Sequence, residues 1–437
     1  NLVNRQLIMK HLFEETSING MRLSNRFVRS ATWDGMATDS GEVTHPMIAL
    51  MRTLAEGGVG VIITGHAFVH EKGKHQPRQL GIHHDDLIPG LLAMTQAVHD
   101  NGGRIVVQLG YGGAYLSKQR IREMTHQDIR NVADAFGRAA KRGKEAGFDG
   151  VQILAAHGFL LSQFLCPRYN DRADEYGGSL SNRGRILMET LQSIRSRVGS
   201  DYPVLVKLNC QDFTENGLTL EESVEVGRML QEHGIDGIEL SGGLLNNPNL
   251  MKNEILEEKD EAYFKEEAKE FKRNIHVPLI LVGGIRSYPV SQRLVEEQVA
   301  DYISLCRPLI REPDLIRRWK AGDLRKAFCI SCNNCIEQAK SGRGLSCVPL
   351  EPERAETFFV QHFEEIPASS PHPAGTGYRV SFGLEQQESA FVPVVKIQMV
   401  RDGKIMEQSP SFPIGSQDHL RVFKTIEDLL KKSPQEG

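Results

Sequence analysis

The stretch "RIVVQLGYGGAYLSKQRIREMTHQDIRNVADAFGRAAKRGKEAGFDGVQIL", residues 104–154, contains two apolar runs separated by a helical pattern. The two runs, 104–110 and 150–154, are rich in Val, Ile and Leu, which is typical of parallel strands buried on both faces. Between them the apolar residues recur with the period of an α-helix. This apolar face consists of Ile129, Val132, Ala133, Phe136 and Ala140. The stretch therefore predicts a strand, a helix and a second, parallel strand.

The same alternation extends through most of the chain. Eight strands alternating with helices predict an α/β fold of the (β/α)₈ TIM-barrel type. An open doubly wound sheet is the alternative, but it usually carries a G-x-G-x-x-G fingerprint after a strand, which this sequence lacks. The six further strand-length runs are 26–32, 59–65, 203–209, 237–242, 278–284 and 301–306.

A smaller region follows the predicted barrel. Residues 351–377 are rich in Pro, Glu and Ser and predict a linker. Beyond them, 378–385 and 392–406 have the pattern of strands, with Asp402-Gly403 as a hairpin turn. Residues 416–432 predict an amphipathic helix, whose inward side chains would be Leu420, Phe423, Ile426 and Leu429 or Leu430. We expect a barrel over 1–325, a cysteine extension over 326–350, and a linker with a small C-terminal α+β appendage over 351–437.

The composition is ordinary for a soluble globular protein, with 40% hydrophobic and 25% charged residues. A net charge of −4 gives no reason to expect nucleic acid or an anionic membrane as a partner. No apolar run approaches the roughly 20 residues that span a bilayer, and the first residues lack the pattern of a signal peptide. We expect a cytoplasmic homo-oligomer that acts on a small molecule.

Residues at the ends of the last two predicted strands suit a phosphate group. The active site of a (β/α)₈ barrel lies at the C-terminal ends of its strands, and phosphate sites recur after strands seven and eight. Gly283-Gly284 and Cys306-Arg307 stand there. Glycine backbone N–H groups can approach a phosphate closely, and an arginine can bind it through two parallel hydrogen bonds. A simple turn of the chain at the two glycines is the plainer alternative.

Two polar residues of neighbouring strands suit a planar heterocycle. Gln108 offers both a donor and an acceptor, and Lys207 can stabilise negative charge that develops on a ring. A flavin needs both, because its reduced ring carries charge near N1 and O2. Each residue alone is equally consistent with an ordinary solvated or paired side chain. Together with a phosphate site they favour a phosphorylated cofactor.

Longer motifs carry a family resemblance. The stretches "NRFVRSAT", "AGFDGVQILAAHGFLLSQFLCPRYNDRADEYGGSLSNRGR", "GLTLEES", "VGGIR" and "CRPLIREPDL" resemble the Old Yellow Enzyme family of NADH:flavin oxidoreductases. Within it, the chain is similar to the branch that contains 2,4-dienoyl-CoA reductase and trimethylamine dehydrogenase. The resemblance implies a barrel that holds FMN at its mouth, with NADH or NADPH as the reductant. It implies that the FMN contacts are Ser30, Ala31, Thr32, His66 (through its backbone), Gln108, Lys207, Gly283, Gly284, Cys306 (through its backbone) and Arg307.

The sequence departs from this family at the substrate site. Many members hold the substrate carbonyl with a His-x-x-His pair, but here the first position is Leu154 and only His157 remains. Many also carry a proton-donating tyrosine two residues later, where this chain has Phe159, which cannot donate. His157 could take either role. Tyr111 is a candidate substitute acid, as is Tyr115, and the alternative for both is packing.

The segment after Gln108 is short compared with the loop that partly covers the site in relatives. Residues 109–127 leave little chain for a lid. We therefore expect an open mouth, unless the C-terminal appendage or a neighbouring subunit covers it.

Four of the seven cysteines gather beyond the last predicted strand, in and after "FCISCNNCIEQ". Cys329, Cys332, Cys335 and Cys347 have the spacing C-x₂-C-x₂-C-x₁₁-C. The spacing suits a [4Fe–4S] cluster and also tetrahedral zinc, and reduced thiols without metal are a third possibility. In the larger relatives a similar quartet binds a [4Fe–4S] cluster, which passes electrons to a second nucleotide-binding domain. A cluster here would need an external electron-transfer partner or would be structural.

The first functional hypothesis is an FMN-dependent NAD(P)H oxidoreductase that passes hydride to an activated acceptor, an α,β-unsaturated carbonyl. A second is an amine dehydrogenase or demethylase whose electrons leave through an iron–sulfur cluster. A third is a flavoprotein that serves electron transfer or sensing. Turnover of NAD(P)H with and without an enone separates these hypotheses.

Overall fold

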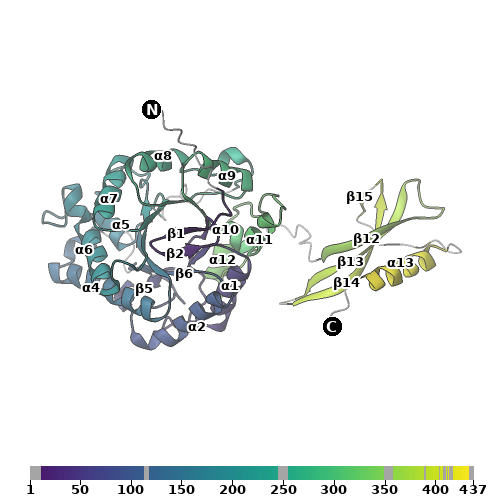
Figure 1. Cartoon of the computed structure of the whole chain (residues 1–437), viewed down its shortest axis with the longest axis horizontal. Coiled ribbons are helices and arrows are strands. Elements are labelled where there is room, and N and C mark those ends of the chain that lie inside the picture. The colour runs from purple at the N-terminus through teal and green to yellow at the C-terminus, as the bar shows by residue number, and fades with distance from the viewer. Residues whose placement is uncertain are drawn as a thin grey trace, which may run out of the picture. The chain divides into compact units, whose positions relative to one another are not determined.

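The chain divides into two compact units, Asn1–Val348 and Pro349–Gly437. Figure 1 shows the first unit as a ring of strands surrounded by helices, and the second as a sheet with one helix. Each unit is described by itself. The computed structural model describes residues 11–112, 118–244, 254–348, 358–387, 390–402, 404–406, 410, 412 and 417–432.

The first unit contains a closed parallel barrel, as predicted. Consecutive strands pair in parallel around the ring, and β11 pairs with β3 to close it, with Ile303 opposite Phe27. An open doubly wound sheet is therefore excluded. A short additional strand, β5 (Ala67–Phe68), pairs with the end of β6. The eight barrel strands are β3 (Phe27–Arg29), β4 (Val61–Ile63), β6 (Ile105–Gly110), β7 (Gly150–Ala155), β8 (Val204–Asn209), β9 (Gly237–Ser241), β10 (Leu279–Val282) and β11 (Tyr302–Leu305).

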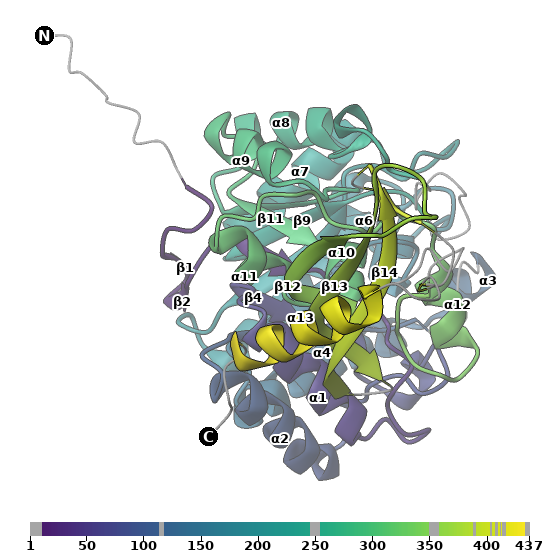
Figure 2. The ribbon, with the colours of Figure 1, turned by 90° about the vertical axis from the view of Figure 1, so that its right-hand side faces the viewer.

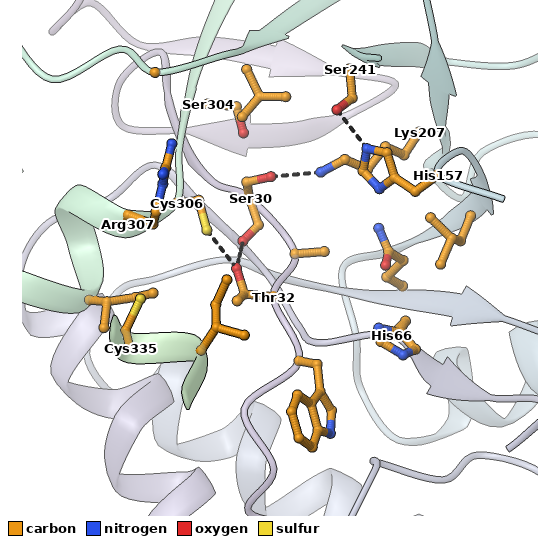
Figure 3. A pocket seen from close by; sticks show the side chains of 18 of the residues that line it. Ser30, Thr32, His66, His157, Lys207, Ser241, Ser304, Cys306, Arg307 and Cys335 are labelled. Carbon is orange, nitrogen blue, oxygen red and sulfur yellow. Dashed lines mark hydrogen bonds between the residues drawn. The ribbon is translucent and has the colours of Figure 1, made fainter. Parts of the chain in front are cut away.

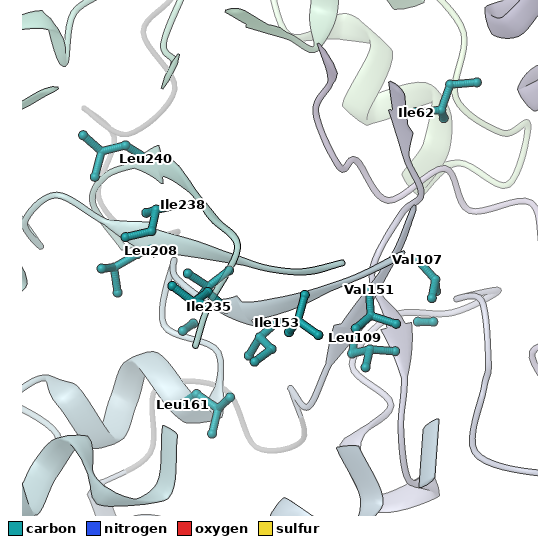
Figure 4. Close-up of a cluster of buried hydrophobic side chains, with 14 of the residues drawn as sticks. Ile62, Val107, Leu109, Val151, Ile153, Leu161, Leu208, Ile235, Ile238 and Leu240 are labelled. Carbon is teal, nitrogen blue, oxygen red and sulfur yellow. The ribbon is translucent and has the colours of Figure 1, made fainter. Parts of the chain in front are cut away.

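Helices cover the outside of the barrel. The predicted helix is α4 (His126–Glu145), and all five predicted core residues of this helix are buried. Figure 4 shows apolar side chains of the strands, such as Val151 and Ile153, in the buried cluster between sheet and helices. The other helices are α1 (His45–Glu56), α2 (Ile88–His99), α3 (Lys118–Glu123), α5 (Leu160–Leu165), α6 (Leu180–Val198), α7 (Leu220–Glu232), α8 (Lys265–Asn274), α9 (Tyr288–Glu296), α10 (Arg307–Arg311), α11 (Leu315–Lys320) and α12 (Asn334–Lys340).

A hairpin of β1 (Thr16–Ile18) and β2 (Met21–Leu23) fills one end of the barrel. Its buried residues Ile18, Met21 and Leu23 pack with Val28 and Val61 inside the ring. These contacts lie near the start of the strands. The hairpin therefore leaves the opposite end, where the strands finish, for a ligand.

The second unit is a four-stranded antiparallel sheet with one helix on one face (Figure 2). The sheet contacts α13 (Asp418–Lys432) through a core that includes Tyr378, Val380, Val422 and Leu429. The α+β character of the appendage is thus as predicted. The strands, in order across the sheet, are β12 (Phe358–Pro367), β13 (Thr376–Gln387), β14 (Ala390–Arg401) and β15 (Lys404–Ile405).

Two details of this unit were predicted wrongly. The segment taken for a linker contains β12, which is stabilised by its ladder with β13. On α13 the side chains of Leu420 and Phe423 are 53% and 61% exposed, while Val422 and Leu429 are buried. The prediction was therefore wrong for Leu420 and Phe423, but it is confirmed for Leu429 and for Ile426, which packs against the core of this unit. Gly403 and the side chain of Leu430 lie outside the described residues.

Candidate active site

A cavity of about 390 Å³ opens at the C-terminal ends of the barrel strands (Figure 3). Its size lies within the range of small-molecule sites. Most of the predicted site residues line it: Ser30, Ala31, Thr32, His66, Gln108, His157, Lys207, Gly284, Cys306 and Arg307. Gly283 and Tyr111 are not part of the lining, whereas Cys335 is.

A buried carboxylate joins the polar residues beneath this cavity. Glu239 of β9 is 0% exposed and lies 3.2 Å from Nζ of Lys207. It also accepts hydrogen bonds from the hydroxyl groups of Ser30 (2.7 Å) and Ser304 (2.8 Å). Its second oxygen accepts from Gln152 (2.9 Å), whose own oxygen accepts from the amide of Gln108 at 2.7 Å.

The network fixes both residues that were predicted to contact a ring. Burial alone would raise the pKa of Glu239, but Lys207 and the three hydrogen-bond donors outweigh burial and hold that pKa below its ordinary value. The carboxylate is therefore charged and retains the ammonium group of Lys207 at the cavity floor. Glu239 and Gln152 were missed by sequence reasoning, although a charged or amide side chain inside an apolar parallel strand is a usable signal.

The opposite side of the cavity carries the predicted phosphate residues. Gly283 and Gly284 have φ values of +147° and +70°, which side chains disfavour, and a Cβ at Gly284 would stand 2.8 Å from the Tyr263 ring. Arg307 follows β11 and donates from Nη1 to Oδ1 of Asn333 at 2.7 Å. Its guanidinium thus connects the strand end with the cysteine segment.

His157 is held in a fixed position at the mouth. Its φ of +60° lies in the left-handed region, which costs a non-glycine residue free energy and is found at functional sites. Its backbone N–H donates to Oδ1 of Asn209 (3.1 Å), and its Nε2 lies 2.7 Å from the hydroxyl of Ser241. Burial, helped by the nearby Lys207 cation, lowers the pKa of His157 to about 3. The imidazole is therefore uncharged at neutral pH.

The two tyrosines proposed as substitute acids differ in how far the structure describes them. Tyr111 is 7% exposed, and its ring packs against Gly73, where a Cβ would stand 2.9 Å from the ring carbons. Tyr115 lies outside the described residues, as does all of 113–117 in the loop on which the predicted open mouth depends. Three further lining residues were not among the predicted site residues: Trp33, which follows Thr32 after β3, and His75 and Gln76, which lie beyond β5.

The four clustered cysteines all belong to the barrel unit and form no disulfide. Cys335, on α12, is buried and lines the cavity. Burial, with the nearby thiols of Cys306, Cys329 and Cys347, raises its pKa to about 12. A guanidinium nitrogen of Arg311 lies 3.8 Å from Sγ of Cys347. The sulfur atoms therefore share one region beside the cavity.

Among the helices of the described part of the chain, none is both long and apolar enough to cross a membrane.

Comparison with known proteins shows the family. The model of the NADH:flavin oxidoreductase / NADH oxidase family matches residues 11–122 and 116–325. The chain is 33% identical to an NADH oxidase of Thermoanaerobacter brockii, over 75% of this chain and 53% of that protein. It is 31% identical to a metal reductase of Desulforamulus reducens, over 78% of this chain and 53% of that protein. The chain thus spans about half the length of these curated relatives.

Solved structures give the same result. A 2-naphthoyl-CoA reductase superposes with a TM-score of 0.71 and 27% identity, covering 77% of this chain and 56% of that one. Histamine dehydrogenase from Rhizobium sp. 4-9 gives a TM-score of 0.69 and 27% identity, covering 82% of this chain and 55% of that one. Because the family model matches most of the chain, this protein belongs to the NADH:flavin oxidoreductase / NADH oxidase family, the Old Yellow Enzyme family.

Proposed function

We propose that this chain is an FMN-dependent NAD(P)H oxidoreductase whose acceptor is an α,β-unsaturated carbonyl compound. The observation that carries the proposal is the buried network of Gln108, Gln152, Glu239, Lys207 and Ser30 under the cavity. Burial of five polar side chains is costly unless they are hydrogen-bonded, and these five satisfy one another while Gln108 and Lys207 also line the cavity. Here they present one amide and one ammonium group toward the same space.

The residues fit FMN by a structural criterion as well. The two glycines at the end of β10 adopt positive φ angles, and Gly284 lines the cavity, so its backbone is accessible where a phosphate would lie. Gln108 and Lys207 would hold the polar edge of the ring, and Gly283, Gly284, Cys306 and Arg307 the phosphate. When bound, FMN would supply a centre that accepts hydride from a nicotinamide and delivers it to an electron-poor carbon.

The protein's own part is to bind, orient and polarise. The Lys207 ammonium, fixed by Glu239 and by a 2.8 Å contact with the Ser30 hydroxyl, would stabilise negative charge on the ring edge. Uncharged His157 would donate a hydrogen bond to the oxygen of the acceptor. Since Phe159 lines the cavity where many relatives have a tyrosine, the proton that completes reduction would come from His157, from Tyr111 or from solvent.

A second candidate function is that of an amine dehydrogenase or an electron-transfer flavoprotein with a [4Fe–4S] cluster. The likeness to histamine dehydrogenase and the cysteine group beside the cavity support it. In the described part of the chain, no three of the four cysteine sulfurs lie within 4.8 Å of one another. A [4Fe–4S] cluster and a tetrahedral zinc ion can both take four cysteine ligands, and metal analysis of the purified protein distinguishes them.

The test is anaerobic turnover of NADH and of NADPH by the purified protein, with and without cyclohex-2-enone. The proposal predicts that enone accelerates the oxidation of the nicotinamide in proportion to enzyme. Rapid reduction of bound flavin without acceleration by any enone would contradict the enone acceptor. Oxidation driven only by a one-electron acceptor such as ferricenium would favour the second candidate.

A further inference from the structure

The cavity has two chemically distinct ends. Cys306 and Arg307 lie on one side, and His66 and His157 lie on the other (Figure 3). The first side matches a phosphate, whereas the second presents two imidazoles from different strands. His66 follows β4 and His157 follows β7. Only His157 occupies a position at which the family resemblance implies a substrate contact.

The imidazole of His66 contains a buried nitrogen that is unsatisfied among the described residues. The residue is 9% exposed, and its buried Nε2 has no partner among the described residues. Its backbone oxygen, by contrast, accepts from Nε2 of Gln79 at 3.1 Å. Leaving a buried polar atom unsatisfied is destabilising. Such an atom in the wall of a cavity indicates a partner that arrives with the ligand.

The surroundings of His66 make it a neutral donor. Its ring packs edge to face on Phe159, with centroids 4.9 Å apart, and Phe159 also contacts the ring of His75 at 5.5 Å. Burial, together with the neighbouring His75, lowers the pKa of His66 to about 3. An uncharged imidazole always carries one N–H group. It can therefore donate to an oxygen of the acceptor without having to be protonated first.

His66 and His157 differ in the hydrogen-bond partners that their imidazoles already have. The Nε2 of His157 already lies 2.7 Å from the Ser241 hydroxyl, which orients that ring. His66 has no such side-chain partner, and its ring can rotate about the Cβ–Cγ bond at low cost. It lies against Phe159, the residue that stands in place of the usual proton donor.

Resting on the proposed function, we propose that the His66 side chain supplies the second hydrogen-bond donor of the acceptor site. It acts with His157 and compensates for Leu154, which fills the first position of the usual pair. The ligand class is a planar molecule with a carbonyl or other electron-withdrawing oxygen conjugated to the reacting carbon. Two donors on that oxygen polarise the double bond toward hydride attack.

The test uses His66→Phe, which retains a flat ring and removes both nitrogens, and His66→Gln, which retains an N–H donor. The matched control is His83→Phe. His83 is a half-buried histidine whose buried Nδ1 has no hydrogen-bond partner among the described residues; it stacks on Phe68 at 4.5 Å and does not line the cavity. Three quantities are measured: kcat/KM for cyclohex-2-enone, the rate of flavin reduction by NADH without acceptor, and the Kd of the non-reducible ketone cyclohexanone from the flavin spectrum.

We expect His66→Phe to lower kcat/KM for the enone about 10²-fold, the cost of losing one such donor. The Kd of cyclohexanone should rise about tenfold or more, and flavin reduction by NADH should be affected less than either of these two quantities. His66→Gln should retain most of both properties, and His83→Phe should match the unaltered protein. Unchanged enone and ketone values in His66→Phe would overturn the inference, as would an equal loss in all three measurements.

The proposed function can fail separately. If the unaltered protein does not reduce enones, the proposed acceptor is wrong. The Kd of cyclohexanone in His66→Phe, compared with the unaltered protein, would still decide whether His66 binds a carbonyl oxygen.

Discussion

Lys207 and Glu239 form an ion pair inside the barrel, with Nζ 3.2 Å from a carboxylate oxygen and side chains 5% and 0% exposed. Removing one partner of such a pair leaves the other buried and uncompensated. Lys207 faces the cavity and Glu239 lies beneath it. A change in either residue should therefore affect both the stability of the barrel and the properties of the cavity.

Glu239→Gln should destabilise the protein by about 3–5 kcal/mol, because it leaves the Lys207 ammonium group without a counter-charge. Glu297→Gln provides a control at the surface pair with Lys265, whose side chains are 50% and 36% exposed, and should cost less than about 1 kcal/mol. Urea unfolding of both variants at neutral pH measures the difference. Equal costs would contradict the buried role of Glu239.

The two cavity histidines predict a loss of stability in mild acid. Their pKa values, about 3 for both His66 and His157 when folded, lie below the ordinary value near 6.5 of an unfolded chain. The unfolded state therefore binds more protons as pH falls through 6.5, and stability declines from there toward pH 3. The slope for each histidine is about 1.4 kcal/mol per pH unit. Urea midpoints at pH 7.5, 6 and 5 test this, and His157→Gln should show a slope smaller by that amount; parallel slopes would refute the prediction.

Arg307 should control flavin affinity. Arg307→Ala removes both a bidentate phosphate partner and the 2.7 Å contact with Asn333, so we expect FMN affinity to fall about 10- to 100-fold. Arg317→Ala is the control, since that side chain is 65% exposed and does not line the cavity. Fluorescence titration of the apoprotein with FMN gives both constants. If Arg307→Ala and Arg317→Ala bind FMN with equal affinity, Arg307 does not contact the phosphate.

The cysteine group should bind iron. We predict about four iron atoms per chain in protein purified without oxygen, because a four-cysteine site holds a [4Fe–4S] cluster. Cys335→Ala should abolish the iron and its broad visible absorption, whereas Cys166→Ala, at a buried cysteine away from the group, should retain both. Zinc in place of iron, or neither metal, would contradict the prediction.

On α13 the same substitution should affect stability strongly at one leucine and hardly at all at another. Leu429 is 2% exposed in the core of the C-terminal unit, so Leu429→Ala should cost about 2–5 kcal/mol. Leu420 is 53% exposed, and Leu420→Ala should change stability by less than about 0.5 kcal/mol. Limited proteolysis of the full chain, which reports opening of this unit, distinguishes the variants; similar cleavage rates would contradict the observed helix face.

The barrel could be predicted because its strands are apolar on both faces, as in residues 104–110, and each returns through a periodic helix such as α4. The cavity residues could be predicted because the active site of a (β/α)₈ barrel lies at the C-terminal ends of its strands. The partners of those residues could not be predicted. Glu239 is recognised as part of the site only through its contact with Lys207 on the neighbouring strand, and no local sequence pattern reveals that contact.

Long-range pairing also explains the errors in the C-terminal unit. The strand β12 exists because β13 provides a ladder for it, and its own sequence reads as an irregular Pro- and Glu-rich segment. Likewise, which apolar stripe of α13 is buried depends on where the sheet meets the helix. The unpartnered side chain of His66 is invisible to sequence, since burial and the lack of a partner are properties of the fold.

The most direct test of the central claim is the visible spectrum of the purified protein under anaerobic conditions, before and after addition of NADH or NADPH. The protein should contain about one FMN per chain, and a reduced nicotinamide should bleach the flavin bands at a rate that Lys207→Met slows by about 10²-fold or more. A protein that binds no FMN, or whose bound flavin neither nicotinamide reduces, would contradict the account.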